Sequence, residues 1–290
     1  NDINVINGFK GNDIIVGAGG NDTLFGDDGD DTFKAGLDNV VTLGQDKLLE
    51  DGDDGVDYID GGEGLFETTG DTVDYSAFGS THNITVDLSI TDSGNSDYTT
   101  VSVNSGSNDY IKNIENIKGS AGADIISGDS YANILDGGLG NDTLIGGSGN
   151  DTLIGGTGND TVDYTSSTSG VTVDLKDTDL DGYETSQDGF GFKDDLSGIE
   201  VVIGSTLADN LTGSDSADTL YGGAGADIIS GGLGADDLKG YGLSTGTDSD
   251  FDTVSYAYVG SLNSVTVNLS TGTGLVTVGT DTSDTDTLTG

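Results

Sequence analysis

The chain lacks several residue types on which other folds depend. Its 290 residues contain no Cys, Pro, Met or Trp, and its eight basic side chains are all Lys. Without Cys, no disulfide can stabilise the fold, although secreted domains often use disulfides. No apolar run approaches the ~20 residues of a membrane-spanning helix. This composition favours a biased, repetitive extracellular polypeptide, in which a metal ion is the natural substitute for disulfides.

Basic charge is scarce as well. Eight Lys stand against 52 acidic residues, which gives a formal charge of -44 and a sequence pI near 4.1. Nucleic acid and anionic membranes need basic patches, so neither is expected as a partner, and a multivalent cation is the natural counter-charge. The apolar share of 32% is low for a conventional core. A disordered acidic chain is the alternative, but disordered tracts do not show strict periodicity.

Signs of catalysis are also missing. His82 is the only histidine, so no HExxH zinc-protease motif is present, and the P-loop signature is absent. We expect His82 to be a packing or exposed residue. The segment is therefore predicted not to be an enzyme.

What the chain does contain is a nine-residue repeat. The pattern is Gly, Gly, any, Gly, any, Asp, any, apolar, any, numbered here as positions 1 to 9. It runs unbroken through GGLGNDTLI, GGSGNDTLI and GGTGNDTVD from Gly137 to Asp163, and it is typical of a calcium-binding parallel β-helix. Counting in nines gives four runs, with position 6 occupied by Asp13, Asp22 and Asp31; by Asp57 and Asp71; by Asp124, Asn133, Asp142, Asp151 and Asp160; and by Asp209, Asp218, Asp227, Asp236 and Asp252.

Each repeat combines a tight turn with a short strand. Gly at positions 1, 2 and 4 permits positive φ and leaves room for carbonyl oxygens. Asp at position 6 adds a hard anionic oxygen, and Ca2+ takes six to eight oxygen ligands, so the position-6 residues are candidate ligands; solvated turn residues are the alternative. Positions 7 to 9 predict a strand with its central side chain inward. Leu135, Leu144, Leu153 and Val162 should therefore line a narrow interior, each contributing about 1.5–3 kcal/mol.

Longer segments interrupt the runs, and we expect them to be β-strand or hairpin insertions. Alternating apolar residues predict half-buried strands at ITVDLS from Ile84, VTVDLK from Val171 and VTVNLS from Val265. Tyrosines recur at the ends of the preceding runs, and we expect packing at module junctions rather than sugar binding for Tyr75, Tyr164 and Tyr256.

We predict three modules within one continuous solenoid. Residues 1–118 form a degenerate repeat module with insertions, whereas 119–203 and 204–290 are β-roll modules with one strand insertion each. Both ends of the chain fit the repeat register, so the last module is expected to be truncated and the chain to be cut from a longer array.

A second calcium signal lies outside the nonapeptides. DTDLDGYETSQD resembles the EF-hand loop, with Asp177, Asp179 and Asp181 at loop positions 1, 3 and 5 and Asp188 at position 12, where the pattern has Glu. These four aspartates are further candidate ligands. A solvated acidic loop is the alternative.

The nonapeptides resemble the repeats-in-toxin (RTX) family of haemolysin-type calcium-binding proteins, and the linking segments resemble those of its large bacterial surface and matrix members. The resemblance implies an all-β parallel β-roll in which loops n and n+2 share calcium, with export by a type I system. On the order of ten ions are expected. The shared pairs would be Asp13 with Asp31, Asp142 with Asp160, and Asp218 with Asp236.

We therefore predict a calcium-binding structural or adhesive segment of a secreted bacterial surface protein, from a surface layer, matrix or adhesin, that folds on calcium outside the cell. Self-association, neighbouring modules and cell-surface polysaccharide are the candidate partners besides calcium. The non-catalytic tail of a type I-secreted enzyme or toxin is the alternative. Ice binding is a third option, because Thr143 and Thr161 should face outward on one side.

Overall fold

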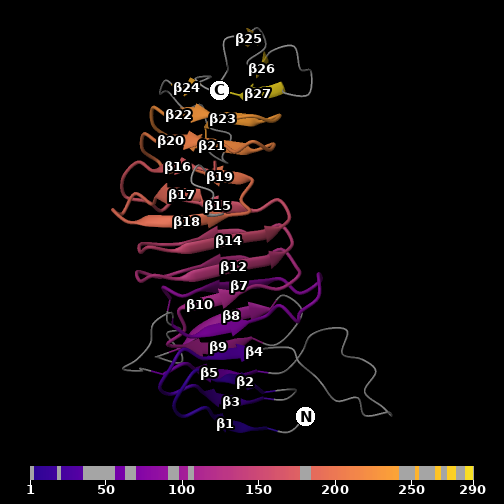
Figure 1. The fold of residues 1–290 in the computed structure, drawn as a ribbon, viewed down its shortest axis with the longest axis vertical. Coiled ribbons are helices and arrows are strands. Elements are labelled where there is room, and N and C mark those ends of the chain that lie inside the picture. Colours follow the sequence, from indigo (N-terminus) through magenta and orange to yellow (C-terminus); the bar gives the residue numbers. More distant parts are fainter. Residues whose placement is uncertain are drawn as a thin grey trace. The chain divides into compact units, whose positions relative to one another are not determined.

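A computed structural model shows an all-β chain, as the repeat predicts (Figure 1). It describes residues 3–17, 21–34, 56–62, 70–90, 98–103, 108–176, 184–241, 252–254, 265–268, 273–278 and 285–289. Regular secondary structure in these ranges is strand throughout. Accordingly, no helix in the described ranges is long and apolar enough to cross a membrane.

Most strands are short because only positions 7 to 9 of each repeat are extended. Strand β13 (Thr143–Ile145) places Leu144 inward, with its two neighbours half-buried. Strand β11 (Ile125–Ser127) pairs with β13 in parallel, with Ile126 opposite Leu144. Paired residues are 18 apart, which is two nonapeptides. Repeat n therefore pairs with repeat n+2, and the predicted parallel β-roll is confirmed.

The core is the column of position-8 side chains. The four residues predicted to line the interior are 0% exposed. Others at this position are exposed by no more than 2%: Leu24, Phe33, Ile59, Val73, Ile111, Ile117, Ile126, Val202, Leu211, Leu220, Ile229 and Leu238. One apolar side chain per repeat thus forms a continuous buried column in the roll, and burying it stabilises each repeat. The insertions add further buried apolar side chains, among them Ile84, Val101 and Val173.

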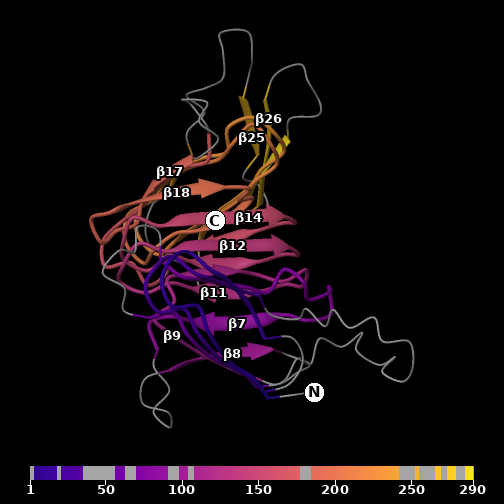
Figure 2. The same cartoon turned by 60° about the horizontal axis from the view of Figure 1, so that its bottom comes forward.

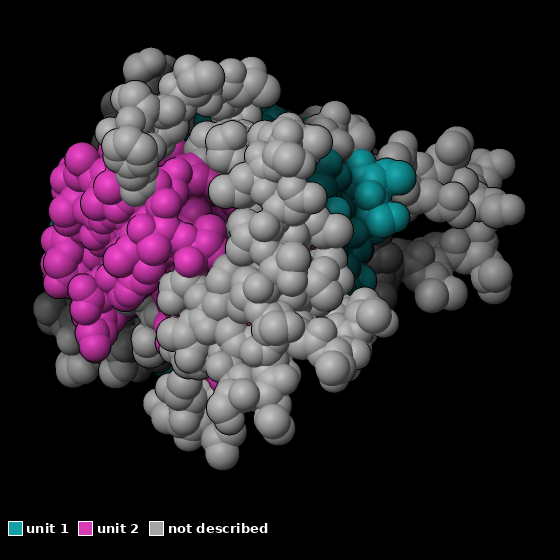
Figure 3. Space-filling model, turned by 90° about the horizontal axis from the view of Figure 1, so that it is seen from above, with its two compact units in different colours: residues 1–146, 154–158 teal, residues 147–153, 159–290 magenta. Residues whose placement is uncertain are grey.

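The chain forms two compact units, which Figure 3 colours separately. Unit 1 comprises Asn1–Gly146 and Ile154–Gly158. Its strands are β1 (Val5–Asn7), β2 (Ile14–Val16), β3 (Thr23–Phe25), β4 (Thr32–Lys34), β5 (Tyr58–Asp60), β6 (Thr72–Asp74), β7 (Ile84–Asp87), β8 (Thr99–Val103), β9 (Asp109–Lys112), β10 (Asn116–Lys118), β11, β12 (Ile134–Leu139) and β13. One sheet runs β1-β3-β5-β9-β8-β7-β11-β13 and the other β2-β4-β6-β10-β12. Strand β14 (Thr152–Thr157) contributes residues to both units.

Unit 2 comprises Gly147–Leu153 and Asn159–Gly290. Its strands are β15 (Thr161–Asp163), β16 (Thr172–Asp174), β17 (Glu184–Gln187), β18 (Lys193–Ser197), β19 (Val201–Ile203), β20 (Asn210–Thr212), β21 (Thr219–Gly223), β22 (Ile228–Ser230), β23 (Asp237–Tyr241), β24 (Thr253–Val254), β25 (Val265–Asn268), β26 (Thr273–Val278) and β27 (Thr285–Thr289). One sheet runs β15-β19-β21-β23-β27-β26-β25 and the other β18-β17-β16-β20-β22-β24.

The predicted insertions are antiparallel meanders built into the parallel sheets. Strands β7 and β8, which lie side by side in Figure 2, pair antiparallel, as do β8 and β9. The outer two rejoin the roll in parallel, β7 with β11 and β9 with β5. Strands β16 to β18 and β25 to β27 repeat the antiparallel pairing. The strands predicted near Ile84, Val171 and Val265 are confirmed, whereas the module boundaries stay a prediction.

Candidate metal centres

The position-6 carboxylates join successive turns of the roll. Oδ1 of Asp31 accepts the backbone N–H of Asp13 at 2.7 Å, and Oδ1 of Asp236 accepts that of Asp218 at 2.9 Å. The structure thus brings together two of the pairs that the resemblance predicts. The same bond, written from donor N–H to acceptor carboxylate, links Asp22 to Asp57, Asp31 to Asp71, Asp57 to Asp109, Asp124 to Asp142, Asp151 to Asp194, Asp209 to Asp227 and Asp227 to Asp252.

The second carboxylate oxygen has a different environment in the first run. Asp22 and Asp31 are only 1% exposed. The Oδ2 atoms of Asp13, Asp22 and Asp31 are buried and accept no hydrogen bond from the described part of the chain. Leaving a buried polar atom unsatisfied costs about 1–3 kcal/mol, and more when it is charged. Burial accordingly raises the pKa of Asp31. A bound cation would remove this penalty.

In several turns the second carboxylate oxygen lies near a main-chain carbonyl oxygen, with the position-1 glycine beside both. A Cβ atom added to Gly8 would lie 2.9 Å from Oδ2 of Asp13 and 3.0 Å from the carbonyl oxygen of Gly26. At Gly137 the corresponding distances are 2.5 Å to Oδ2 of Asp142 and 2.8 Å to the carbonyl oxygen of Gly155. A carboxylate from turn n and a carbonyl from turn n+2 therefore converge beside position 1, in a space that only Gly leaves open.

This donor set fits calcium. Within the described ranges no three His, Asp or Glu side chains converge as a metal-binding group. Any ion beside position 1 must therefore draw most of its ligands from main-chain carbonyls, with single carboxylates supplying the charge. Hard oxygen donors in flexible number are what Ca2+ prefers, whereas Zn2+ selects nitrogen and sulfur.

Most of the predicted position-6 residues are buried in the turns. Asp13 and Asp252 are partly exposed. The remainder have relative exposures of 4% or less: Asp22, Asp31, Asp57, Asp71, Asp124, Asn133, Asp142, Asp151, Asp160, Asp209, Asp218, Asp227 and Asp236. Such burial is unusual for ionisable side chains and sets these turns apart from ordinary solvated ones.

Three of the four candidate ligands in the EF-hand-like loop, Asp177, Asp179 and Asp181, lie outside the described residues, and the end of the loop forms strand β17. Asp188 is 0% exposed. Its Oδ1 accepts the backbone N–H groups of Phe190, Gly191 and Phe192 at 2.9–3.0 Å. Asp188 thus caps the turn that leads into β18, and the calcium site of this loop stays a prediction.

Four acidic residues continue the carboxylate ladder and were not predicted. Asp109 and Asp194 accept the N–H groups of Asp57 and Asp151 at 3.1 and 3.2 Å. Glu115 and Glu200 accept those of Asp71 and Asp160 through Oε2 at 2.8 and 2.9 Å. All four occupy position 6 of repeats without the glycine pattern. The one sequence signal is the apolar residue two positions later.

In two of these four residues, Asp109 and Asp194, a tyrosine satisfies the second carboxylate oxygen. Tyr75 and Tyr164 are buried, and each hydroxyl donates to the Oδ2 atom of an aspartate at 3.1 Å, Tyr75 to Asp109 and Tyr164 to Asp194. Both tyrosines sit in the interior beside an insertion, as the packing prediction requires. Tyr256 lies outside the described residues.

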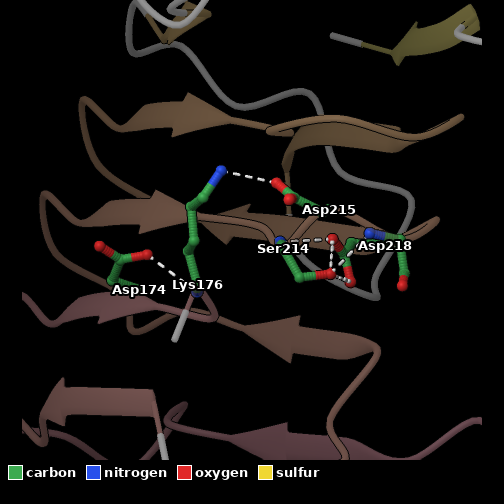
Figure 4. Close-up of polar contacts among 6 residues, drawn as sticks. Asp174, Lys176, Ser214, Asp215 and Asp218 are labelled. Carbon is green, nitrogen blue, oxygen red and sulfur yellow. Dashed lines mark hydrogen bonds and ion pairs between the residues drawn. The ribbon is translucent and has the colours of Figure 1, made fainter. Parts of the chain in front are cut away.

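Serine satisfies the second oxygen in other turns. The Ser214 N–H and Oγ–H donate to Oδ2 of Asp218 at 2.7 and 3.0 Å (Figure 4). Burial nevertheless raises the pKa of Asp218 to about 6, with Glu200 adding repulsion. Burial likewise raises the pKa of Asp124 and of Asp209. The hydrogen bonds to these carboxyls offset part of the cost of burying them.

His82 is a packing residue. It is 2% exposed, and its ring lies 5.7 Å from that of Phe78. One pentapeptide, Gly242 to Gly246, reads GxSxG, the string of a hydrolase nucleophile elbow. It lies outside the described residues, and that motif needs a strand-to-helix turn and a partner histidine.

A comparison with protein-family models agrees with this geometry. A family model described as the RTX calcium-binding nonapeptide repeat matches in four copies, at residues 4–41, 113–144, 127–162 and 203–238. No curated protein matches the chain. Among solved structures, the extracellular lipase LipA from Serratia marcescens aligns with 100% of this chain and 38% of its own, at 17% identity and a TM-score of 0.27. The chain thus spans well under half of that lipase.

Proposed function

The chain is built on RTX calcium-binding nonapeptide repeats, and from that premise we propose that it is a structural or adhesive segment of a secreted bacterial surface protein. In this proposal it leaves the cell through a type I system, folds on calcium outside and belongs to a surface layer, matrix or adhesin. The observation that carries the calcium role is the set of buried Oδ2 atoms facing carbonyls in a chain of charge -44.

In this proposal the carboxylate oxygens and the main-chain carbonyls of the chain have different roles in holding calcium. Aspartate Oδ1 positions the side chain by accepting an N–H from the neighbouring turn, which leaves Oδ2 for the ion. The carbonyl of a position-1 Gly completes the approach from the next turn. A bound calcium ion would offset the carboxylate charge and would link turns n and n+2. Without it, 52 acidic side chains repel one another in a fold with a narrow core.

Export and folding are then coupled through calcium concentration. Extracellular calcium modules typically bind with Kd values of about 10⁻⁴ to 10⁻³ M. In a low-calcium cytosol the chain would stay loose, and outside the cell binding to the folded form would draw it into the roll. No enzymatic activity is assigned to this segment.

A calcium titration followed by circular dichroism and light scattering tests the proposal. We expect a cooperative gain of β signal at submillimolar to millimolar calcium, and no such gain with magnesium, which resists dehydration and demands octahedral geometry. A fully folded spectrum in excess chelator would refute calcium-dependent folding. Scattering that rises after folding supports an assembling scaffold, whereas folding without assembly favours the tail of a secreted enzyme or toxin.

A further inference from the structure

We propose that position 2 of each nonapeptide decides whether its turn holds calcium. Turns with a positive φ at position 2 hold an ion, whereas turns whose position-2 N–H bonds to the position-6 side chain hold none. We call these open and closed turns. The inference rests on the proposed calcium function and divides the predicted ligands into two classes. Among the turns that the structure describes in full, the open ones span residues 8–13, 26–31, 137–142, 146–151, 155–160, 222–227 and 231–236, and the closed ones span 119–124, 128–133, 204–209 and 213–218.

Closed turns share one hydrogen-bond pattern. The position-2 N–H donates to the position-6 side chain: Ser120 to Asp124 at 2.6 Å, Asp129 to Asn133 at 2.9 Å, Ser205 to Asp209 at 2.7 Å and Ser214 to Asp218 at 2.7 Å. The position-2 side chain in turn accepts the position-4 N–H, at 2.9 Å from Gly122, 2.8 Å from Tyr131, 3.0 Å from Leu207 and 3.0 Å from Ser216. Such turns are what Ser and Asp side chains favour.

This pattern competes directly with a cation. In the turn of Asp124, Oδ1 accepts the Ile84 N–H at 2.8 Å and the Ser120 hydroxyl at 2.9 Å, while Oδ2 accepts the Ser120 N–H. Both oxygens are thus covered by hydrogens that carry partial positive charge. A calcium ion would have to break these bonds and lie against the N–H dipole, so the closed turn is satisfied without metal.

Open turns have the opposite backbone. Phe9 and Asp27, both at position 2, have φ values of 74° and 72°, a conformation that is strained for residues with a Cβ. The Oδ2 atoms of Asp13 and Asp31 in these turns accept no hydrogen bond from the described residues. The strained φ of the position-2 residue therefore turns its N–H away from the position-6 carboxylate. Position 2 has φ between 91° and 106° at Gly138, Gly147, Gly156, Gly223 and Gly232.

Position 4 follows the same division. In open turns it is glycine with positive φ: Gly11, Gly29, Gly140, Gly149, Gly158, Gly225 and Gly234. In closed turns it is Gly122, Tyr131, Leu207 or Ser216, none of which has positive φ. The two conformations therefore differ across the whole turn, and the division does not depend on one dihedral angle.

The closed turns lie at the start of the third and fourth runs, two in each. Two nonapeptides make one full winding of the roll. The first winding of each of these runs therefore consists of two closed turns, and the open turns follow it. The closed turns thus offer calcium-independent starting points onto which calcium-bound turns add. This order gives calcium-driven folding a direction along the chain.

The test counts bound calcium on the intact chain by equilibrium dialysis at saturating calcium. Asp31→Asn, in an open turn, is expected to lose about one ion per chain. Asp218→Asn, in a closed turn, is expected to leave the count unchanged. Asn133 already occupies the same position of a closed turn, so Asn is compatible with that fold. Equal losses in both variants would overturn the inference.

A gain of binding provides the second arm. Ser214→Gly combined with Ser216→Gly restores the glycine pattern at positions 2 and 4 and removes the hydroxyl that holds the closed form. We expect this variant to gain about one ion, with circular dichroism showing that it folds. An unchanged count in the folded variant would contradict the role of position 2. Failure of the unmodified chain to bind calcium would refute the proposed function itself, which is a different result.

Discussion

Glycine is favoured at positions 1 and 2 of the turn for different physical reasons. At position 1 the missing side chain leaves space for a carboxylate and a carbonyl oxygen to approach each other, as beside Gly8 and Gly137. At position 2 the requirement is a dihedral angle: Gly138 has φ of 96°, which a residue with a Cβ adopts only under strain. A Cβ there would also lie 2.7 Å from the carbonyl oxygen of Ser120.

Alanine at position 2 should therefore destabilise the roll. We expect Gly138→Ala to lower the free energy of unfolding by about 1–3 kcal/mol, from the strained φ and the crowded carbonyl. Gly79→Ala is the matched control, because a Cβ at Gly79 would meet no atom within 4 Å and its φ is not positive. Urea unfolding at saturating calcium measures both. Equal midpoints would show that the turn relaxes around a side chain.

The repeat predicted which carboxylates line the roll, but it did not predict which group bonds to the second oxygen of each carboxylate. Asp31 and Asp218 occupy the same position of their repeats, and both are buried. Their second oxygens differ because Ser214 donates to Asp218, whereas Asp27 is held at positive φ. Asp27 and Ser214 are both small polar residues that favour turns. Composition therefore cannot separate the two conformations, and the backbone of the whole turn decides.

The inserted meanders are the elements that depart from the repeat. Each leaves the roll, adds antiparallel strands and returns with an aspartate at position 6, Asp109 in β9 and Asp194 in β18. The buried Tyr164 hydroxyl donates to Oδ2 of Asp194, so a phenol occupies the place that a cation takes in an open turn. The hydrogen bond from the neutral Tyr164 hydroxyl thereby holds the inserted strand β18 against the roll.

Removing that hydroxyl should loosen the insertion. We expect Tyr164→Phe to cost about 1.5–3 kcal/mol of unfolding free energy, because a buried carboxylate loses a hydrogen bond while the ring packing is kept. Tyr131→Phe is the control, since Tyr131 is 72% exposed. Thermal unfolding with calcium present compares the two variants. A Tyr164→Phe protein as stable as the control would mean that water or an ion replaces the hydroxyl.

Local alternation predicted where strands β7, β16 and β25 occur, because a period of two is a short-range signal. Strand or hairpin insertions were predicted, but the residues that form the partner strands were not. The pairing of β8 with β7 and of β17 with β16 joins residues that lie 11 or more positions apart in the sequence, beyond the reach of a short-range pattern. For the same reason Asp109 and Asp194 went unrecognised: their glycine turn is replaced by a strand.

Charge is the property that governs the molecule as a whole. Lys34 and Lys118 lie on paired strands opposite aspartates, Lys34 beside Asp74 at 2.5 Å and Lys118 beside Asp136 at 2.7 Å. Hydrogen bonds from Lys34 and Ser76 lower the pKa of Asp74, although its burial acts in the opposite direction. With eight Lys for 52 acidic residues, such pairs cover only a small part of the charge. Bound cations or protons must offset the remainder.

Protons and calcium should therefore stabilise the fold in opposite pH ranges. The pKa of Asp218 is raised to about 6 in the folded chain from 3.8, and that of Asp31, Asp124 and Asp209 is raised as well. Between pH 3.8 and about pH 6 the folded form binds more protons than the unfolded form, so the free energy of unfolding falls as pH rises.

Without calcium, acidification from pH 7 to pH 5 should increase the folded fraction. With limiting calcium the same change should decrease it, because protons compete for the open-turn carboxylates. Circular dichroism at both conditions measures the two slopes, and Asp218→Asn should flatten the calcium-free one. A calcium-free chain that unfolds on acidification would show that its carboxylates are stabilised in their charged form, which is the reverse of what their burial implies.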